Sequence, residues 1–253
     1  MTASGLTALD EAVGICEAAA DERITVRLAG GLAIQYLTPE FPPRGGDRQD
    51  LDLAILSSDR RALAQFVAER GYVADKTFNA LYGHKQLFFQ STETGRSLDV
   101  LVDRLHMCHT VEFKGRLGRM PVTLDVSDLL LTKLQIVELN EKDARDVLYL
   151  CSAYPVRDGD EPATIGLDRI RLIVGNDWGW WRTVTLNLDR IIALATGDNS
   201  KLIPEGGKHG AVEQLGALSR AIERAPKSLR WKARARVGER VRWYEVPEET
   251  PHH

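Results

Sequence analysis

The sequence predicts an α/β protein, an α+β arrangement in which a mixed sheet with flanking helices is followed by a mostly helical C-terminal half. Short apolar stretches of strand length alternate with helical periodicity in the first half, and from Ser127 onward the periodicity is helical throughout. A boundary between Leu124 and Asp128 is the natural division, so we expect domains over 1–125 and 126–253. A length of 253 residues is enough for two modest cores.

Composition limits the class of protein. Hydrophobic residues make up 43% of the chain and charged residues 27%, close to the averages of soluble globular proteins, which excludes wholesale disorder. No window approaches the roughly 18 apolar residues that a membrane helix needs, and the opening residues lack a basic region followed by an apolar stretch. Three widely spaced cysteines suit reduced thiols. We therefore expect a cytoplasmic protein without a membrane segment.

The elements of the first half follow from periodicity and turn residues. Before the Pro- and Gly-rich loop over 38–49, we expect a helix over 6–20, a strand over 24–29, a turn at Gly30 and Gly31, and a helix over 32–37. After it, we expect a strand over 50–56, a helix over 59–70 and a hairpin of strands over 86–90 and 97–103.

The second half is predicted to consist of helices. The helical patterns cover 128–139, 141–150, 165–174 and a Trp-rich run that continues to residue 194. The segment 201–243 carries 11 Lys or Arg against 4 Glu. Such a basic stretch is either a solvated helix face or a contact surface for phosphates, of RNA or of a nucleotide.

Two acids interrupt an apolar strand candidate. Asp50 and Asp52 stand two apart, so within a strand they project on the same side. Adjacent carboxylates in a low-dielectric setting require a proton or a cation between them, and an oxygen-rich site of this kind suits Mg²⁺. On its own the pattern is a weak signal and is more often two solvated acids at a strand end.

A third acid strengthens the interpretation as a metal site. Asp99 is the exception in another apolar strand candidate, and if the two strands are neighbours the three carboxylates converge on one edge of the sheet. Three such acids hold divalent metal ions for in-line phosphoryl transfer. Asp103 is an alternative third acid at the strand's end. Upstream, Gly30 and Gly31 between strand and helix place backbone N–H groups where a phosphate can approach, although an ordinary tight turn has the same pattern.

In this order, the motifs LAGGLAIQYL, RQDLDLAIL and SLDVLV resemble the nucleotidyltransferase superfamily that includes DNA polymerase β and the aminoglycoside nucleotidyltransferases. The segments DLLLTKLQIVEL and EKDARDVLYL are similar to the helical motifs of abortive-infection nucleotidyltransferase toxins, with a lysine on one helix and a D-x-x-D type motif on the next. The matching residues are Lys133, Asp143 and Asp146. The likeness spans about 28–150.

The resemblance implies transfer of a nucleoside monophosphate from an NTP, with Mg²⁺ or Mn²⁺, to a hydroxyl or phosphate acceptor. In that picture Asp50, Asp52 and Asp99 bind metal, with Asp99 near the attacking group, and Gly30 and Gly31 bind the triphosphate. Lys133 contacts phosphate. From its apolar neighbours at helical spacing, Lys133 is either such a ligand or a lysine whose stem covers core. Asp143 and Asp146 equally suit the first turn of a helix.

Several residues depart from the family pattern or are weaker candidates. Many family members have Gly-Ser at the first motif, and toxin-like members often have a single arginine before the acids, where this chain has both Arg44 and Arg48. A zinc site at His106, Cys108 and His109 lacks a second ligand pair. His84 and Lys85 face the nucleotide or are surface residues, and the tryptophans at 178, 180 and 181 stack on a base or pack between helices.

The function hypotheses are therefore three. The first is a toxin-like nucleotidyltransferase that acts on RNA, especially tRNA, or on protein, with an antitoxin protein as a further partner. The second is an enzyme of the same class that modifies an antibiotic or another small molecule. The third is a non-catalytic nucleotide-binding module of the same fold, which the presence of all three acids disfavours.

Overall fold

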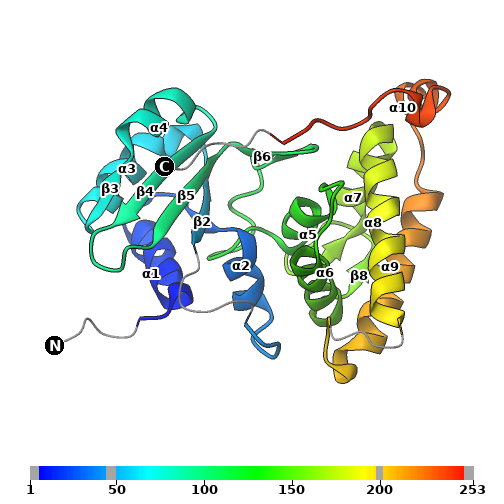
Figure 1. Cartoon of the computed structure of the whole chain (residues 1–253), viewed down its shortest axis with the longest axis horizontal. Coiled ribbons are helices and arrows are strands. Elements are labelled where there is room, and N and C mark those ends of the chain that lie inside the picture. The colour runs from blue at the N-terminus through cyan, green and yellow to red at the C-terminus, as the bar shows by residue number, and fades with distance from the viewer. Residues whose placement is uncertain (1–5, 44–49, 198–201, 248–253) are drawn as a thin grey trace. The chain divides into compact units, whose positions relative to one another are not determined.

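The computed structural model describes residues 6–43, 50–197 and 202–247. The chain forms two compact units. The first contains residues up to 105 together with 112–125, and the second contains 106–111 together with the chain from 126 onward. Figure 1 shows a sheet with flanking helices in the first unit and helices in the second. The expected α/β class, with a mixed sheet followed by a mostly helical half, is confirmed.

A five-stranded sheet organises the first unit, in the order β1-β2-β5-β4-β3. Strands β2 and β5 pair in parallel, and the other neighbours pair antiparallel. The elements in chain order are α1 (Ala8–Asp21), β1 (Arg27–Leu28), α2 (Gly30–Leu37), β2 (Leu51–Ile55), a 3₁₀ turn (Ser57–Asp59), α3 (Arg60–Ala68), β3 (Tyr72–Ala74), α4 (Lys76–Tyr82), β4 (Gln86–Ser91) and β5 (Ser97–Val102). The antiparallel pairing of β4 with β5 confirms the predicted hairpin.

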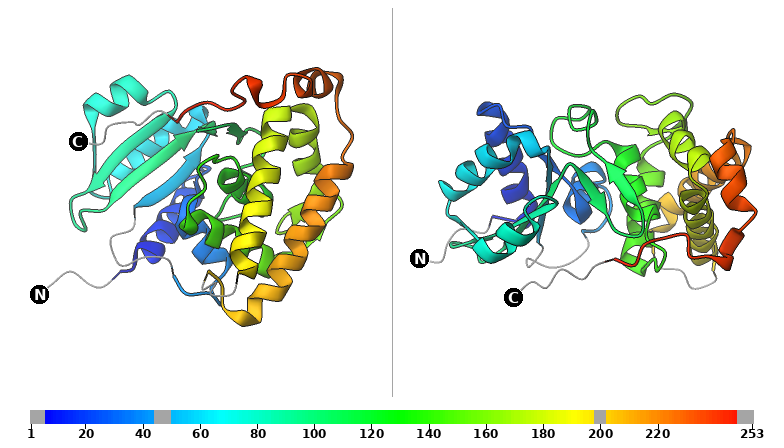
Figure 2. Two further views of the ribbon diagram at one scale, coloured as in Figure 1. Left: turned by 45° about the vertical axis from the view of Figure 1, so that its right-hand side comes forward. Right: turned by 90° about the horizontal axis from the view of Figure 1, so that it is seen from above.

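The two faces of the sheet differ in burial. Alternate residues of the central strands are at most 1% exposed and form the core of the unit: Leu51, Leu53, Ile55, Leu98, Val100 and Val102. In Figure 2, α1 and α3 lie on one side of the sheet. Helix α1 is tied to the sheet through Glu11, which accepts hydrogen bonds from Tyr72 and Arg96. The opposite faces of β5 and β4 are half-exposed, and polar side chains are tolerated there.

Several boundaries differ from the sequence predictions. Helix α1 begins at Ala8 because Thr7 and Asp10 form a capping box at its N-terminus. Helix α2 begins at Gly30, two residues earlier than expected, so the glycine turn is its first turn. Strand β2 begins at Leu51, which leaves Asp50 just before the strand. Strand β3 and helix α4 were not predicted, because three and seven residues are too few to show a period.

Helices form the second unit, as the periodicity predicts. They are α5 (Val126–Leu134), α6 (Glu141–Ala153), α7 (Leu167–Asn176), α8 (Trp178–Thr196), α9 (Glu205–Arg224) and α10 (Leu229–Ala235). Two short strands, β8 (Val156–Arg157) and β9 (Ile165–Gly166), pair in parallel, and β6 (Arg104–His106) pairs with β7 (Thr110–Glu112). Helix α9 packs along α6 and α8 (Figure 2).

Helix α5 is the centre of the second unit, since all nine of its residues are buried. Helices α6, α7 and α8 pack against it. The sequence predicted this helix to continue to residue 139, but it ends at Leu134. Asn187 of α8 donates hydrogen bonds to the carbonyls of Leu134 and Ile136. These carbonyls therefore have partners without the N–H groups of a further helical turn. A polar group far along the chain therefore ends this helix.

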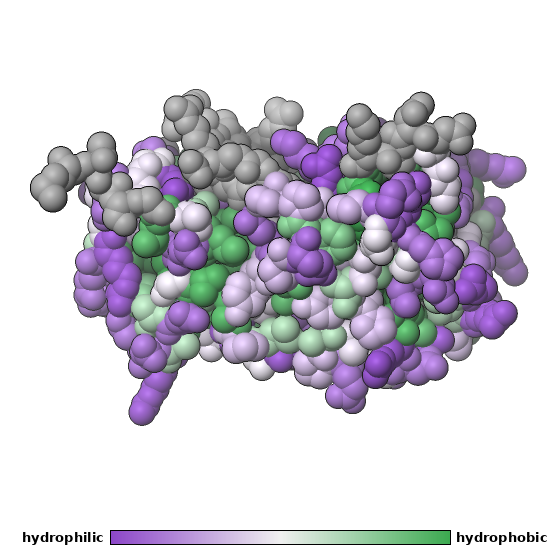
Figure 3. All heavy atoms as spheres, turned by 90° about the horizontal axis from the view of Figure 1, so that it is seen from below, coloured by the Kyte–Doolittle hydropathy of each residue, from purple (hydrophilic) through white to green (hydrophobic). Residues whose placement is uncertain are grey.

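No helix among the described residues is long and apolar enough to cross a membrane. Figure 3 shows one face of the molecule, on which hydrophobic residues are interspersed with polar and charged ones.

Candidate active site

Two of the predicted carboxylates lie side by side on the sheet. Asp52 of β2 and Asp99 of β5 are direct partners in the parallel register. Neighbouring strands are about 4.8 Å apart, and side chains at paired positions of parallel strands project on the same face. Both residues are half-buried, while the residues that flank them in each strand belong to the core. The strand adjacency on which the sequence argument depended is therefore present.

Gly30 brings the first turn of α2 against Asp52. Its φ of +61° lies in the left-handed region that glycine adopts without strain. A Cβ atom at this position would lie 2.0 Å from Asp52 Oδ2 and 2.8 Å from Asp52 Cγ, so only glycine leaves room for the carboxylate. A backbone hydrogen bond also connects the start of α2 to β2, because the N–H of Ala29 donates to the carbonyl of Asp52 at 2.8 Å. The carboxylate of Asp52 thus lies directly beside the start of a helix.

The N-terminus of α2 is suited to an anion. Its N-cap residue is Ala29, which supplies no side-chain cap to the first-turn N–H groups, and the first turn contains no acidic side chain. Uncapped first-turn N–H groups, together with the helix dipole, attract phosphate. A phosphate bound at Gly30 and Gly31 would lie next to the carboxylate of Asp52, and two anions in contact require a cation between them. The turn and the acid together favour a metal-bound phosphate ligand.

Gln86 has no distinguishing signal in the sequence, but it contacts one acid of the carboxylate pair. Its Nε2 donates to Asp99 Oδ1 at 2.6 Å from the neighbouring strand β4. This contact orients the carboxyl group of Asp99. Alternation within QLFFQ places Gln86 on the half-exposed face, but the register of β4 against β5 was needed to bring it to Asp99.

Asp103, the alternative third acid, belongs to a turn. Its φ is +63°, its Oδ1 accepts a hydrogen bond from the N–H of Ser57 at 2.8 Å, and its own N–H donates to the carbonyl of Ile55. These contacts hold together the ends of β2 and β5. The structure thus gives Asp103 a structural task and leaves Asp99 as the acid beside Asp52.

The full set of three carboxylates is not assembled in the described residues. Asp50 is exposed and precedes β2, and no group of three or more His, Cys, Asp or Glu is arranged to hold a metal ion in the described ranges. Asp52 and Asp99 nevertheless fit a divalent cation, since they are half-buried oxygen donors held in register on adjacent strands. A cation between them would relieve their mutual repulsion.

Lys133, Asp143 and Asp146 come together in the second unit. Lys133 Nζ lies 2.8 Å from Asp143 Oδ1 and 3.0 Å from Asp146 Oδ2. The lysine is 8% exposed and lies among the buried residues of α5. Asn140 caps α6 and also donates to Asp143 Oδ2 at 2.8 Å. The buried ion pairs join α5 to α6.

The remaining candidates have other environments. His106 bonds Thr110 and Glu245, His109 bonds Thr183, and Cys108 is buried as a free thiol, so these residues do not form a zinc site. The tryptophans of α8 pack among aromatic and cationic side chains. Arg44 and Arg48 lie outside the described residues.

No protein-family model and no curated protein sequence matches the chain. Solved structures do match it. ANT(2″)-Ia in complex with adenylyl-2″-tobramycin is 15% identical with a TM-score of 0.36, over 55% of this chain and 84% of that one. An antigenic nucleotidyltransferase-like protein from Paracoccidioides brasiliensis is 12% identical with a TM-score of 0.41, over 87% and 94%. A STING-associated CdnE c-di-GMP synthase from Capnocytophaga granulosa is 12% identical with a TM-score of 0.27, over 85% and 82%.

Proposed function

We propose that this protein is a divalent-metal-dependent nucleotidyltransferase, which moves a nucleoside monophosphate from an NTP to an acceptor. The observation that carries the proposal is the pairing of Asp52 with Asp99 in register on parallel strands, with the carboxylate of Asp52 against the first residue of α2. Acids that interrupt two core strands at the same level are hard to explain by stability alone, because charge repulsion opposes their adjacency.

Each part of the site has a distinct role in this reaction. The first-turn N–H groups of Gly30 and Gly31 bind the triphosphate, and the helix dipole contributes to that binding. Asp52 and Asp99 hold Mg²⁺ or Mn²⁺, and we assign Asp50 as a third ligand from its place just before β2. When bound, the metal neutralises phosphate charge and lowers the pKa of an attacking hydroxyl. Gln86 positions the carboxylate of Asp99.

The chemistry at these residues is an in-line displacement. The attacking oxygen of the acceptor forms a bond to the α-phosphorus as the bond to the bridging oxygen breaks and pyrophosphate leaves. Asp99 lies beside the attacking group and accepts its proton. Binding of the triphosphate at α2 fixes the direction from which the acceptor oxygen approaches the α-phosphorus. The role of Lys133 as a phosphate ligand stays a prediction, since its contacts in the structure are with two acids.

The preferred acceptor class is nucleic acid, RNA or tRNA, ahead of protein. The basic segment 201–243 supports this preference, because it carries 11 Lys or Arg against 4 Glu. A small-molecule acceptor is the alternative within the same reaction. A non-catalytic nucleotide-binding module would keep NTP binding without transfer. An antitoxin partner and a cytoplasmic location remain predictions of the sequence.

The test is transfer of label. The protein is incubated with each α-labelled NTP, Mg²⁺ and total cellular RNA or lysate, and labelled products are resolved before and after ribonuclease treatment. Asp52→Asn and Asp99→Asn are expected to lower incorporation by about 100-fold or more. Asp103→Asn is the matched control, because asparagine keeps the oxygen that accepts from Ser57. Equal labelling by wild type and Asp52→Asn would overturn the proposal.

A further inference from the structure

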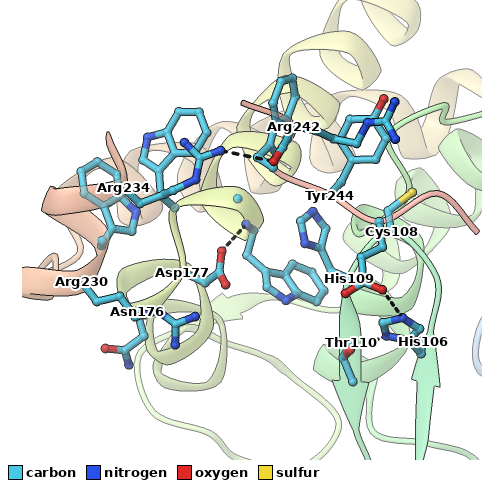
Figure 4. Close-up of a pocket in the computed structure, with 16 residues that line it drawn as sticks. His106, Cys108, His109, Thr110, Asn176, Asp177, Arg230, Arg234, Arg242 and Tyr244 are labelled. Atoms are coloured by element: carbon cyan, nitrogen blue, oxygen red, sulfur yellow. Dashed lines mark hydrogen bonds and ion pairs between the residues drawn. The ribbon is translucent and has the colours of Figure 1, made fainter. Parts of the chain in front are cut away.

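A second site lies within the helical unit and shares no residue with the carboxylate pair. It is a cavity of about 440 Å³, a size typical of ligand-binding pockets. Figure 4 shows its lining residues, which come from three segments: the β6–β7 hairpin, the junction of α7 and α8, and the C-terminal stretch from α10 onward. Aromatic rings and guanidinium groups dominate the lining.

The aromatic walls are held in place by one another. Trp178 meets Trp243 edge to face with ring centroids 6.1 Å apart, and His109 stacks on Trp180 at 4.9 Å. Thr183 Oγ1 joins the two pairs, since it bonds His109 Nε2 at 2.8 Å and accepts from Trp243 Nε1 at 3.0 Å. The cavity is therefore preorganised to accept a flat aromatic ring.

The charge of the lining favours an anion. Three arginines line the cavity, at 230, 234 and 242. Arg234 is occupied, because it donates to the carbonyls of Gly238 and Val241 and lies over the ring of Trp178. The side chains of Arg230 and Arg242 are exposed, and neither makes a hydrogen bond or ion pair within the described residues. Arg242 lies over the ring of Tyr244, a contact that leaves its N–H donors open to a ligand.

The two acids of the lining are already engaged. Asp177 caps α8 by accepting from the N–H of Trp180, and Glu245 pairs with His106 at 2.9 Å. Burial lowers the pKa of His109 to about 4, so its ring is uncharged at neutral pH. An aromatic cage for a cationic ligand would present uncompensated acids rather than guanidinium groups. The cavity instead fits a ligand that combines a flat ring with negative charge.

We propose that this cavity binds a nucleotide unit, with the base among the tryptophans and the phosphate on Arg230 and Arg242. Stacking on aromatic side chains and phosphate contacts from arginine are the usual means of holding an unpaired nucleotide. Two sources share this chemistry: a free mononucleotide and an unpaired nucleotide at the end of an RNA strand. The inference goes beyond the proposed transfer reaction and does not depend on it.

Intrinsic fluorescence offers a selective probe of this cavity. All five tryptophans of the chain lie in the helical unit, at 178, 180, 181, 231 and 243, and four of them line the cavity. The full-length protein is titrated with AMP, adenosine, inorganic phosphate and a six-nucleotide single-stranded RNA, with excitation at 295 nm. The Asp52→Asn background neutralises one of the two carboxylates of the pair, so a response there does not depend on an intact carboxylate site.

The matched variants differ only in where charge is removed. The double variant Arg230→Gln and Arg242→Gln removes both rim cations, and the control Arg236→Gln and Arg240→Gln removes two exposed arginines of the same segment that do not line the cavity. We expect AMP or the RNA to quench fluorescence in wild type, in Asp52→Asn and in the control, with affinity at least about 10-fold weaker in the cavity variant. The tryptophan emission of each variant without ligand, compared with that of wild type, checks that the variant is folded.

The outcomes distinguish the two sources of the nucleotide and also test the proposal itself. Tighter binding of the RNA than of AMP assigns the cavity to an RNA end, and equal or tighter binding of AMP assigns it to a free nucleotide. Adenosine without phosphate should bind much more weakly than AMP. Absence of quenching by both nucleotide probes, or equal affinity in the two double variants, would overturn the inference. Loss of label transfer in Asp52→Asn with nucleotide quenching intact would leave this site standing independently of the transferase.

Discussion

The backbone conformation of Gly30 and its lack of a Cβ atom together leave room for the carboxylate of Asp52. Gly30→Ala adds a Cβ that would lie 2.0 Å from Asp52 Oδ2, at a φ of +61°. We expect the variant to lose about 1–2 kcal/mol of unfolding free energy from the left-handed conformation, and to lose NTP binding because the carboxylate is displaced. Urea unfolding and NTP titration measure the two effects.

Gly95→Ala is the matched control for Gly30→Ala. Gly95 also has a positive φ, of +71°, but a Cβ there meets no atom within 4 Å. The Gly95→Ala variant should lose a similar amount of unfolding free energy and bind NTP as tightly as wild type does. If Gly30→Ala bound NTP as well as Gly95→Ala does, the placement of Asp52 at the helix start would be irrelevant to the ligand.

At the scale of single residues, the sequence singled out two members of the candidate site. Asp52 and Asp99 stood out because each interrupts an apolar strand, and alternation placed them on the half-exposed face. Their adjacency depended on strand order, which local pattern does not specify. Gln86 was missed because its contact with Asp99 follows from the register of β4 against β5, and a polar residue at a strand start carries no signal of its own.

The pairing of α5 with α6 depends on a buried cation. Lys133 lies between Asp143 and Asp146, and replacing it removes the ammonium group that pairs with both buried carboxylates. We expect Lys133→Met to lower the unfolding free energy by about 3–5 kcal/mol. Chemical denaturation measures this loss.

Lys232→Met, at an exposed position of α10, is the control and should change stability by less than about 0.5 kcal/mol. A stability loss in Lys133→Met no larger than this would contradict the structural role. If Lys133 also contacts phosphate, the variant has a raised KM for NTP at temperatures where it is folded, and an unchanged KM limits the lysine to joining helices.

Helical elements were predicted well where the periodicity is long, as in α6 and α8. The end of α5 was not, because Asn187 of α8 caps carbonyls more than 50 residues away in the chain. The paired strands β8 and β9 are two residues each and have no local signature. Contacts between distant segments, rather than propensity, determine these features.

The pH dependence of unfolding is a property of the whole folded chain to which His109 contributes. Burial lowers the pKa of His109 from 6.5 to about 4, so between these values the unfolded state binds a proton that the folded state does not. Stability should therefore fall as the pH falls from about 6.5 to 4, by roughly 3 kcal/mol from this group. Above pH 6.5 the group contributes no slope.

His109→Phe keeps a ring against Trp180 and removes the titrating nitrogen, so the slope between pH 4 and 6.5 should flatten. His209→Gln, at an exposed position, should leave the slope unchanged. Denaturation midpoints measured across this pH range make the comparison. An equal slope in wild type and His109→Phe would show that the ring is not held neutral by burial.

The division into an α/β part and a helical part was visible in the sequence, because the change of period near residue 126 persists to the end of α9. The packing of 106–111 with the second unit was not visible, since it depends on contacts such as that of Glu245 with Cys108. The aromatic cavity was equally hidden, because its tryptophans come from α8, α10 and the C-terminal stretch. Separation in sequence conceals such a site.

The most direct test of the carboxylate pair is the binding of Mn²⁺, followed by electron paramagnetic resonance in the presence of a non-hydrolysable NTP analogue. It requires no knowledge of the acceptor. Wild type and Asp103→Asn should bind the ion with equal affinity, while Asp52→Asn and Asp99→Asn should each bind it at least about 10-fold more weakly, because each loses the negative charge of one of the paired carboxylates. Equal Mn²⁺ affinity in all four proteins would contradict the assignment of Asp52 and Asp99 as the metal site.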